Sequence, residues 1–514
     1  MGAPRGCVAW NVLAVECRTN RLGVIVYDTP SYHPHRRQFI IAPVFHPIGD
    51  DWRAIELSDS HVLSHCPDLR VENLVDGQGT GKYLIGNAFE CDKSHPPTAE
   101  SLVGSSGCEA EALTYSWAGR WALIDPKMVL PDASGLLGLF YTWDSSGRLI
   151  ITSSLALMQN LIPSCAPYKR KLSWYGMSWF PLPNSRLQGV KKLLPDQVLD
   201  LEKQTVRRVR RHSIRPLPSN DADAAARLVL ESLICIWEQV SSRFGKVNLA
   251  LTAGLDTRTL LASAMASGAK FQTVTLMHRN VARADMIVPR ELSDMCGVPW
   301  SLVQSGRFSC RLRNVYDQHT CLDTNDGDRY WFARDMFKWL DDDDALIRGG
   351  TFEIGRTFYC HRFRGLDWER VCNDPSSLVR RFKDFGSTRL ETKQFRDWLA
   401  WRDMNKEDLG WKDVFYRDQR LAGWLSAIEQ SLDLVRGTSI PFANSSYVAD
   451  LLLSVEEEKR RSGEIQRKVI ALAEGSLLRV PINAPLGSKT YKKAQQLREK
   501  VYKAAVELRN LLIS

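Results

Sequence analysis

The segment from Val247 to Met277 constrains the fold of this chain more than any other stretch of its sequence. An apolar run at 247–251 leads into a turn of small and hydroxyl residues, and a helical pattern follows at 258–267. A second apolar run covers 271–277. A strand, a helix and a strand in this order predict two parallel strands joined by a right-handed crossover. We therefore expect a parallel sheet in this half of the chain.

Residues 1–200 show a different pattern, in which short apolar runs alternate with turn signals and helical periodicity is sparse. The sequence Asp-Ser-Ser-Gly at 144–147 predicts a hairpin loop between two of these runs. An apolar run at 7–15 predicts a buried strand rather than a signal peptide, because no cleavage site follows it. The whole pattern predicts an α+β domain dominated by antiparallel sheet. Further strands are predicted at 22–27, 38–44, 83–88, 120–124, 138–143 and 148–152.

Two prolines, Pro216 and Pro218, mark the change between these patterns. The apolar spacing at 221–244 predicts a helix directly after them, and the C-terminal part of the chain is mostly helical in pattern. The predicted fold class is therefore α+β followed by α/β. We expect one domain at 1–212 and a second at 220–514.

The composition of the chain limits which ligands and which cellular environment suit it. The formal net charge of +9, from 68 basic and 59 acidic residues, suits an acidic ligand such as ATP and does not indicate a nucleic-acid partner. The twelve cysteines are scattered without a C-x-x-C pair, which is typical of reduced thiols in a cytoplasmic protein. No apolar stretch reaches the roughly 18 residues of a membrane span. The densest basic cluster alternates with valines, as in a solvated edge strand, and consists of Arg207, Arg208, Arg210 and Arg211.

The turn at 252–257 carries the chemistry that we expect. A strand that passes through small and hydroxyl residues into a helix exposes backbone N–H groups at the helix N-terminus, which suits a phosphate. Thr252 and Thr257 add hydroxyl donors, and Gly254 allows a close approach of the ligand. Asp256 can hold Mg²⁺, which bridges phosphate oxygens. The alternative is an ordinary strand–helix turn with a capping threonine.

This turn resembles S-G-G-x-D-S, the pyrophosphate loop of N-type ATP pyrophosphatases. Each threonine keeps a hydroxyl, whereas one alanine replaces a glycine. The resemblance implies that ATP and Mg²⁺ bind here, through Thr252, Ala253, Gly254, Leu255, Asp256 and Thr257.

The chain as a whole resembles the asparagine synthetase family, in which a glutaminase domain of the N-terminal-nucleophile type precedes a PP-loop synthetase domain. In the first half, the resemblance is carried by 86–89, 119–125, 131–141 and 189–196. It implies an antiparallel N-terminal-nucleophile-type domain followed by a parallel-sheet synthetase domain with a helical C-terminal part.

The first half departs from that family at the nucleophile. A working glutaminase of this type needs a cysteine at the new N-terminus once Met is removed, but position 2 is Gly2. The first cysteine, Cys7, lies inside an apolar run, and a thiol without an adjacent α-amine has no local base. The family's N-G-E-I-Y-N segment is absent as well, since 86–89 lacks its acid and its amides. We expect a degenerate domain without glutaminase activity, so that an amine replaces ammonia.

Two acids in the second half are candidates by resemblance. Glu353 ends the stretch 346–353, which resembles the family's G-x-G-x-D-E loop with one residue fewer, and it is implied to be a second metal ligand after Asp256. Asp418 lies in 416–420, a segment that several relatives place beside the acyl-adenylate. There it could orient or deprotonate the attacking amine. The alternative for Asp418 is an exposed, charged helix face.

A lysine near the C-terminus completes the predicted site. Lys489 lies in the turn-rich stretch 485–490, which resembles the segment that delivers a catalytic lysine in this family. Such a lysine would stabilise charge that develops on the leaving phosphate. Lys492 and Lys493 are rivals for the same role.

The leading hypothesis is an ATP-dependent amide ligase that releases AMP and pyrophosphate. Without a glutaminase, the relatives in view are β-lactam synthetase and the lasso-peptide cyclases, which implies ring closure in antibiotic biosynthesis on a small-molecule or peptide carboxylate and an amine. A lasso cyclase would need a precursor peptide and partner proteins, and a homodimer is compatible with the family. The alternatives are a PP-loop enzyme that modifies tRNA and a catalytically inactive scaffold of a biosynthetic pathway.

Overall fold

A computed structural model places residues 34–483 of the chain, with internal gaps. Two predicted strands, at 7–15 and 22–27, lie outside the residues that it describes. The internal segments that are not described are 75–80, 93–106, 171, 173–176, 210–216, 278–282, 305–309, 324–326, 383–388 and 403–409.

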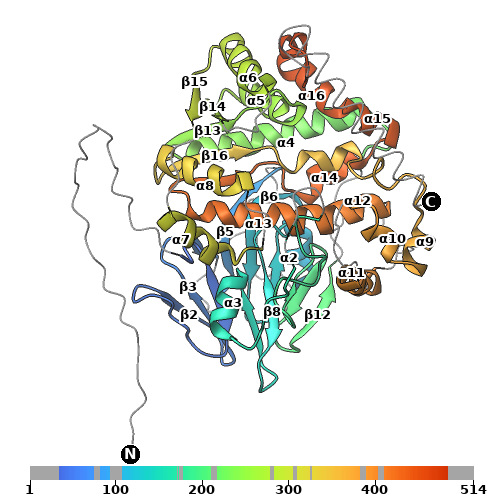
Figure 1. The fold of residues 1–514 in the computed structure, drawn as a ribbon. Helices are drawn as coiled ribbons and strands as arrows, with labels where there is room; N and C mark the ends of the chain where they lie inside the picture. The colour runs from blue at the N-terminus through green and yellow to red at the C-terminus, as the bar shows by residue number, and fades with distance from the viewer. Residues whose placement is uncertain are drawn as a thin grey trace, which may run out of the picture.

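The N-terminal half contains two six-stranded sheets in which neighbouring strands are antiparallel (Figure 1). The first sheet has the order β10 (Lys191–Lys192), β8 (Phe140–Trp143), β9 (Leu149–Thr152), β1 (Phe39–Ala42), β3 (His61–His65) and β2 (Arg53–Ser58). The second has the order β12 (Thr205–Arg208), β11 (Gln197–Asp200), β7 (Met128–Pro131), β6 (Trp117–Ile124), β5 (Tyr83–Glu90) and β4 (Val71–Asn73). Side chains from both sheets, among them Ile41 and Ile85, share one buried apolar cluster. The predicted antiparallel architecture is confirmed.

The predicted hairpin loop at 144–147 is also confirmed. Strands β8 and β9 pair from Phe140 with Thr152 to Trp143 with Leu149, so the loop closes directly beyond their last pair. Asp144 stabilises it, because its Oδ1 accepts the backbone N–H groups of Ser146 at 2.8 Å and Arg148 at 2.9 Å.

The C-terminal half is built on a five-stranded sheet in which every neighbouring pair is parallel, as the strand–helix–strand pattern predicts. The last of its strands comes from a region that the sequence pattern assigned mostly to helices. The order is β15 (Trp300–Gln304), β14 (Gln272–Met277), β13 (Lys246–Ala250), β16 (Asp344–Arg348) and β17 (Thr438–Pro441).

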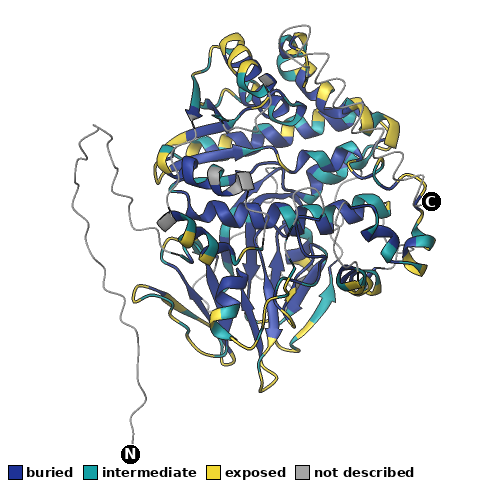
Figure 2. Cartoon of the chain, in the orientation of Figure 1, coloured by how far each residue is buried: buried dark blue, intermediate teal, exposed yellow. Residues whose placement is uncertain are grey.

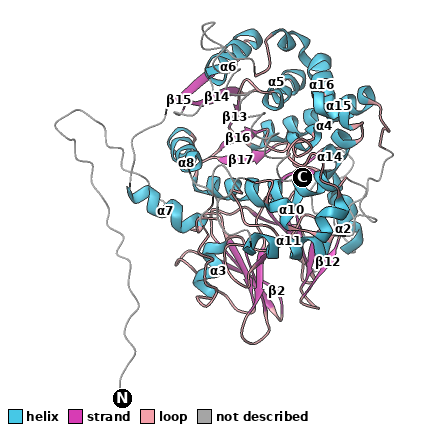
Figure 3. Ribbon diagram, turned by 45° about the vertical axis from the view of Figure 1, so that its right-hand side comes forward, coloured by secondary structure: helices cyan, strands magenta, loops and turns pink. Residues whose placement is uncertain are grey.

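Helices cover both faces of this sheet (Figure 3). One face carries α4 (Ala222–Arg243), α5 (Leu255–Ser267) and α16 (Glu464–Glu474), which pack on one another. The helix predicted at 221–244 is confirmed as α4, and Asp221 caps it by accepting the N–H groups of Asp223 and Ala224 at 3.0 Å. The other face carries α7 (Cys310–Thr320), α8 (Gly327–Trp339) and α13 (Ser426–Ser431).

A helical run from 411 to 434 lies between the parallel sheet and the antiparallel sheets, and most of it is buried (Figures 1 and 2). It passes from α12 (Trp411–Phe415) through a π-helix (Tyr416–Leu425) into α13. Lys192 of β10 reaches this run and donates to the Ala422 carbonyl and the Ser426 hydroxyl, both at 2.6 Å. A buried cation of the N-terminal half thus fixes the central helix of the other half.

The remaining helical elements surround these layers. They are α2 (Gly107–Leu113), α3 (Leu155–Leu161), α6 (Arg283–Cys296), α9 (Trp368–Asn373), α10 (Ser376–Val379), α11 (Arg389–Trp401), α14 (Ser446–Leu453), α15 (Glu457–Ser462) and four 3₁₀ turns, Thr114–Ser116, Phe352–Arg356, Leu432–Leu434 and Gly475–Arg479. No helix in the described part of the chain has both the length and the apolar character that crossing a membrane requires.

Candidate functional site

The turn at 252–257 joins the end of β13 to the start of α5, and its two threonines close it. The hydroxyl oxygens of Thr252 and Thr257 lie 3.1 Å apart, and the Thr257 hydroxyl accepts the Thr252 N–H at 3.1 Å. Gly254 stands at the N-cap of α5 and donates its N–H to the Thr252 hydroxyl at 3.2 Å. The first turn of a thirteen-residue helix therefore begins within a loop that presents hydroxyl groups.

Asp285, in the first turn of α6, holds this loop from the side. Its Oδ1 accepts the N–H of Ala253 at 2.8 Å, so the backbone at the replaced glycine is fixed by a carboxylate from another element. Asp285 therefore helps to shape the loop.

Arg258 supports the loop from behind, and sequence reasoning missed it. Its side chain is fully buried in α5 and donates to the carbonyl oxygens of Ala253 at 3.3 Å, Leu477 at 3.0 Å and Pro481 at 3.3 Å. The N–H of Asn483 also donates to the Ala253 carbonyl, at 3.2 Å. The C-terminal segment therefore lies directly on the loop. The signal in the sequence was Arg258 itself, a charged residue that directly follows the S-G-G-x-D-S-like turn and begins the predicted helix.

The second glycine-containing loop lies beside the first. Strands β13 and β16 are parallel neighbours, so their carboxyl ends meet at the same edge of the sheet. A Cβ on Gly349, directly after β16, would lie 3.4 Å from the Cβ of Asp256, so the glycine allows the two loops to pack closely. The chain then turns through a 3₁₀ helix that contains Glu353 and Arg356.

Arg356 joins the two predicted metal ligands. Its Nη2 lies 2.6 Å from Oδ2 of Asp256 and 3.3 Å from Oε1 of Glu353. The other oxygen of Asp256, Oδ1, is buried without a hydrogen-bond partner. Burial raises the pKa of Asp256 to about 7, and the charge of Glu353 adds to this effect, although Arg356 opposes it. The structure thus places the two acids on one guanidinium and leaves one carboxylate oxygen bare.

Two carboxylates that share one guanidinium suit Mg²⁺, which is held by one or two carboxylates together with phosphate and water oxygens. The bare Oδ1 of Asp256 is the donor atom that such an ion would take. No group of three or more His, Cys, Asp or Glu side chains suited to a metal occurs among the described residues. Phosphate oxygens would therefore have to complete the coordination, and Arg356 would have to give up at least one of its partners.

The prediction that Asp418 contacts the amine needs correction. Asp418 is fully buried in the π-helix, and its carboxylate is taken by Arg402, by the Arg417 Nε at 3.1 Å and by the Trp398 indole at 2.8 Å. Burial raises its pKa, while the two arginines oppose this. The alternative, an exposed helix face, is wrong as well. Asp418 belongs to a buried ion-pair cluster that includes Asp196 of the N-terminal half.

Tyr416, two residues before Asp418, does reach the site. Its hydroxyl donates to Oε2 of Glu353 at 3.4 Å, and its ring packs on Phe358, with the ring centroids 5.3 Å apart. The segment 416–420 therefore contacts the second loop, through Tyr416 rather than Asp418. Lys489 lies outside the described residues, as do Lys492 and Lys493.

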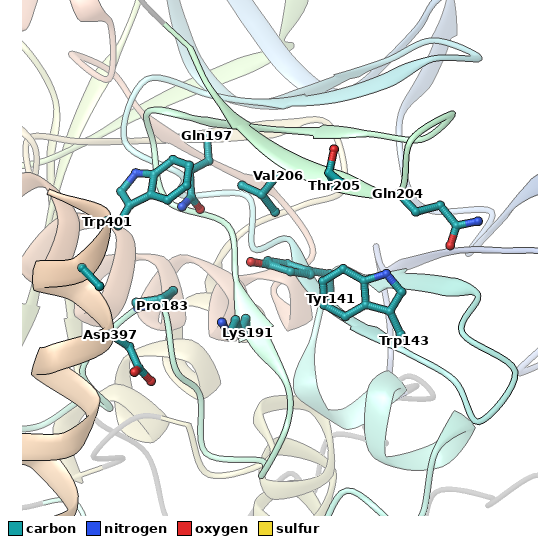
Figure 4. A pocket seen from close by; sticks show the side chains of 11 residues that line it. Tyr141, Trp143, Pro183, Lys191, Gln197, Gln204, Thr205, Val206, Asp397 and Trp401 are labelled. Carbon is teal, nitrogen blue, oxygen red and sulfur yellow. The ribbon is translucent and has the colours of Figure 1, made fainter.

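The pocket shown in Figure 4 lies in another part of the molecule. Its volume is about 360 Å³, and its walls come from β8, β10, β11, β12 and α11. Tyr141 and Trp143 form one wall, and Trp401 lies opposite them. None of the residues of the two loops lines it. The remaining lining residues are Pro183, Lys191, Gln197, Gln204, Thr205, Val206, Asp397 and Ala400.

Comparison with known proteins adds no assignment. No family model and no curated protein matches the chain. Among solved structures, the glutamine-dependent NAD⁺ synthetase of Acinetobacter baumannii in complex with ADP is 13% identical, covers 31% of this chain and 30% of its own, and has a TM-score of 0.17. The NMN synthetase of Francisella tularensis is 12% identical, covers 39% of this chain and 94% of its own, and has a TM-score of 0.20. Because the chain spans only 30% of the first protein and both scores are low, neither similarity carries an inference.

Proposed function

We propose that this chain is an ATP-dependent amide ligase that releases AMP and pyrophosphate, and that it resembles asparagine synthetases without keeping their glutaminase activity. One observation carries the proposal: two loops at the carboxyl edge of a parallel sheet bring Asp256 and Glu353 onto the same guanidinium, at the N-terminus of α5. Ligands of open α/β sheets bind at this edge. The reaction is inferred from the resemblance in sequence, and the geometry of the two loops supports the inference.

In the proposed reaction, a carboxylate oxygen of the substrate attacks the α-phosphorus of ATP, and pyrophosphate leaves. The amine nitrogen then attacks the carbonyl carbon of the acyl-adenylate, AMP leaves with the bonding electron pair, and the amine loses a proton. The hydroxyls of Thr252 and Thr257 and the N-terminus of α5 would bind the departing pyrophosphate. Mg²⁺, when bound, would neutralise charge on the phosphate oxygens, and Asp256 and Glu353 would hold it.

Lys489 keeps its proposed role in stabilising charge on the leaving group. Asn483, the last described residue, donates to the loop carbonyl of Ala253, and Lys489 follows six residues later. Six residues span at most about 20 Å when extended, which leaves the loop within reach of Lys489. Asp418 is not part of the proposal, because its carboxylate is buried in ion pairs.

The substrate side of the proposal rests on resemblance alone. We infer that the carboxylate and the amine belong to small molecules or a peptide, as in the ring-closing relatives, and that a precursor peptide and pathway proteins are partners in the second case. A cytoplasmic homodimer is compatible with this. The tRNA alternative loses support where it can be checked, because Arg207 pairs with Glu111 and Arg208 with Asp196.

Exchange of labelled pyrophosphate into ATP tests the proposal. The full chain with Mg²⁺, ATP and a mixture of carboxylic acids and short peptides should catalyse the exchange, and titration calorimetry should show Mg·ATP binding without any acid. A chain that binds no Mg·ATP would contradict the proposal and favour a scaffold. Binding of RNA that weakens steeply with salt would instead support the tRNA alternative.

A further inference from the structure

Arg420, in the π-helix, differs from the other arginines around the site because it forms no ion pair with any described residue. Its guanidinium stacks on the ring of Trp424, with the Cζ atom 3.3 Å from the ring centroid, and lies 5.4 Å from the centroid of Phe358. Its Nε is buried without a hydrogen-bond partner. By contrast, Arg356 and Arg417 pair with carboxylates. The fold thus holds one cation between aromatic rings and leaves its charge unmatched.

The position of Arg420 relates it to the two loops. Tyr416, Arg420 and Trp424 follow at intervals of four residues, so they lie along one side of the helix. Tyr416 contacts Glu353, and Phe358 packs on both Tyr416 and Arg420. Phe358 is 41% exposed, so this cluster of rings opens to solvent. Arg420 therefore lies about one helical turn beyond Tyr416, which contacts the candidate metal ligand Glu353.

We propose that Arg420 binds a carboxylate that takes no part in the bond-forming step and that belongs to one of the two organic substrates; this inference rests on the proposed function. Stacking occupies the faces of a guanidinium but leaves the N–H groups at its edge free to bind a carboxylate in bidentate fashion. The aromatic neighbours also fix the side chain in place, so little conformational entropy is lost on binding. The substrate would be a dicarboxylic acid, an amino acid or an acidic peptide.

Two considerations favour a spectator carboxylate. An ion pair with the reacting carboxylate would draw charge away from the oxygen that must attack phosphorus, so it would slow adenylation. The ATP phosphates are assigned to the loop at 252–257, and Arg420 is linked to Glu353 through the rings of Phe358 and Tyr416. A second carboxylate, held at this distance from the phosphates, would orient the first.

Modification with phenylglyoxal, mapped by mass spectrometry on the full chain, tests the proposal. Arg420 should react, and saturating glutarate should slow its reaction by about tenfold, the effect expected of a charge-assisted bidentate contact. Neutral glutaramide should not protect it. Glycine, tested in parallel, distinguishes a carboxylate of the amine substrate from one of the acid. Arg396 of α11, an exposed arginine, is the matched control, and glutarate should leave its rate unchanged.

Each outcome decides the matter. Protection of Arg420 by glutarate or by glycine supports a carboxylate subsite. Calorimetry should then show that Arg420→Lys has lost glutarate binding. Protection by Mg·ATP alone would assign Arg420 to phosphate and overturn the proposal, and so would the absence of any protection. Mg·ATP binding to the same sample is measured separately. If that binding is absent while glutarate still protects Arg420, the proposed function fails and the carboxylate subsite stands.

Discussion

Two buried aspartates show how the halves of the molecule differ. Asp132, in the N-terminal half, is fully buried, and its carboxylate accepts the N–H groups of Ser134, Leu136 and Leu137 at 2.8–3.1 Å. It also accepts the side-chain amide of Asn444 at 2.8 Å. Asp256, in the other half, has one carboxylate oxygen paired with Arg356, and the other is buried without a hydrogen-bond partner. Both lie in segments that resemble motifs of one family.

The two carboxylates differ in whether every oxygen has a hydrogen-bond partner within the protein. The partners of Asp132 come from its own turn and from one amide across the interface, so nothing is left for a ligand to supply. A buried polar atom without a partner costs roughly 1–3 kcal/mol, and such atoms are retained where a ligand completes them. The hydrogen-bonding capacity of Asp132 is therefore met within the fold, whereas Asp256 keeps one oxygen that the proposed ligand would complete.

The strongest way to break this comparison is to neutralise Asp256. Asp256→Asn keeps the size of the side chain but removes the charge that would hold Mg²⁺, so pyrophosphate exchange should fall by about 1,000-fold. Any loss of stability should be small, because Arg356 keeps its pairing with Glu353 and burial already disfavours the charged form of Asp256. Asp294→Asn, on the exposed surface of α6, is the control and should leave exchange unchanged. Exchange at the wild-type rate in Asp256→Asn would show that Asp256 is no more functional than Asp132.

The matching change in the N-terminal half is Asp132→Ala. It leaves three backbone N–H groups and an amide without their acceptor, so the free energy of unfolding should fall by at least about 3 kcal/mol. Urea unfolding followed by circular dichroism measures this. Asp144→Ala is the control, because Asp144 also accepts backbone N–H groups but in a solvent-exposed hairpin, where the loss of unfolding free energy should be clearly smaller. An equal loss of unfolding free energy in the two variants would contradict a structural role of Asp132.

Local patterns predicted whether each sheet is parallel or antiparallel, together with some of its strands. Alternation and turn residues predicted the hairpin at 144–147, and the order of strand, helix and strand predicted the parallel pairing of β13 and β14. The helix α4 was predicted within one residue at each end. Strand β17 was missed because four residues between helices give no period, and only its neighbour β16 makes them a strand.

The candidate site was predictable only where it is local. The loop at 252–257 is contiguous in sequence, and the meeting of Asp256 with Glu353 follows from the adjacency of their strands. Arg356 and Arg420 could not be found in this way, since one partner of each lies far away in the chain, Asp256 for Arg356 and Phe358 for Arg420. Asp418 was misassigned because burial is a tertiary property: a helix segment rich in charges is buried here by Arg402 and Arg417.

The third prediction concerns Lys489. The turn-rich composition of 485–490 predicts a surface segment, so Lys489→Ala should change the free energy of unfolding by no more than about 0.5 kcal/mol. As an electrostatic stabiliser of the reaction it should cost about 100-fold in turnover. Before a substrate is known, protection of 485–490 from proteolysis by Mg·ATP is the measurement. Unchanged cleavage with Mg·ATP weakens the assignment, and normal turnover would transfer it to Lys492 or Lys493.

The fourth prediction asks whether every buried acid of the N-terminal half is structural. Burial raises the pKa of Glu90, in β5, from 4.5 to about 8. The folded state therefore binds an extra proton between these values, and its stability is full below pH 4.5 and is lost as the pH rises through 8. Glu90→Gln should match the wild type at low pH and be measurably more stable above pH 8, as shown by urea unfolding. Pyrophosphate exchange should not change; a loss would give the N-terminal half a functional acid.

The smallest expected effect is at Cys7, and it tests whether the N-terminal half retains its own chemistry. A glutaminase nucleophile of this type must carry the free α-amine, because that amine accepts the thiol proton. Gly2 occupies the position that Met removal would expose, and four residues, 3 to 6, lie between it and Cys7. Glutamate release from glutamine should therefore be absent in the wild type, and Cys7→Ser should alter neither exchange nor stability. Stoichiometric labelling of an N-terminal cysteine by a glutamine-mimicking electrophile would reverse the comparison, because both halves would then hold an active site.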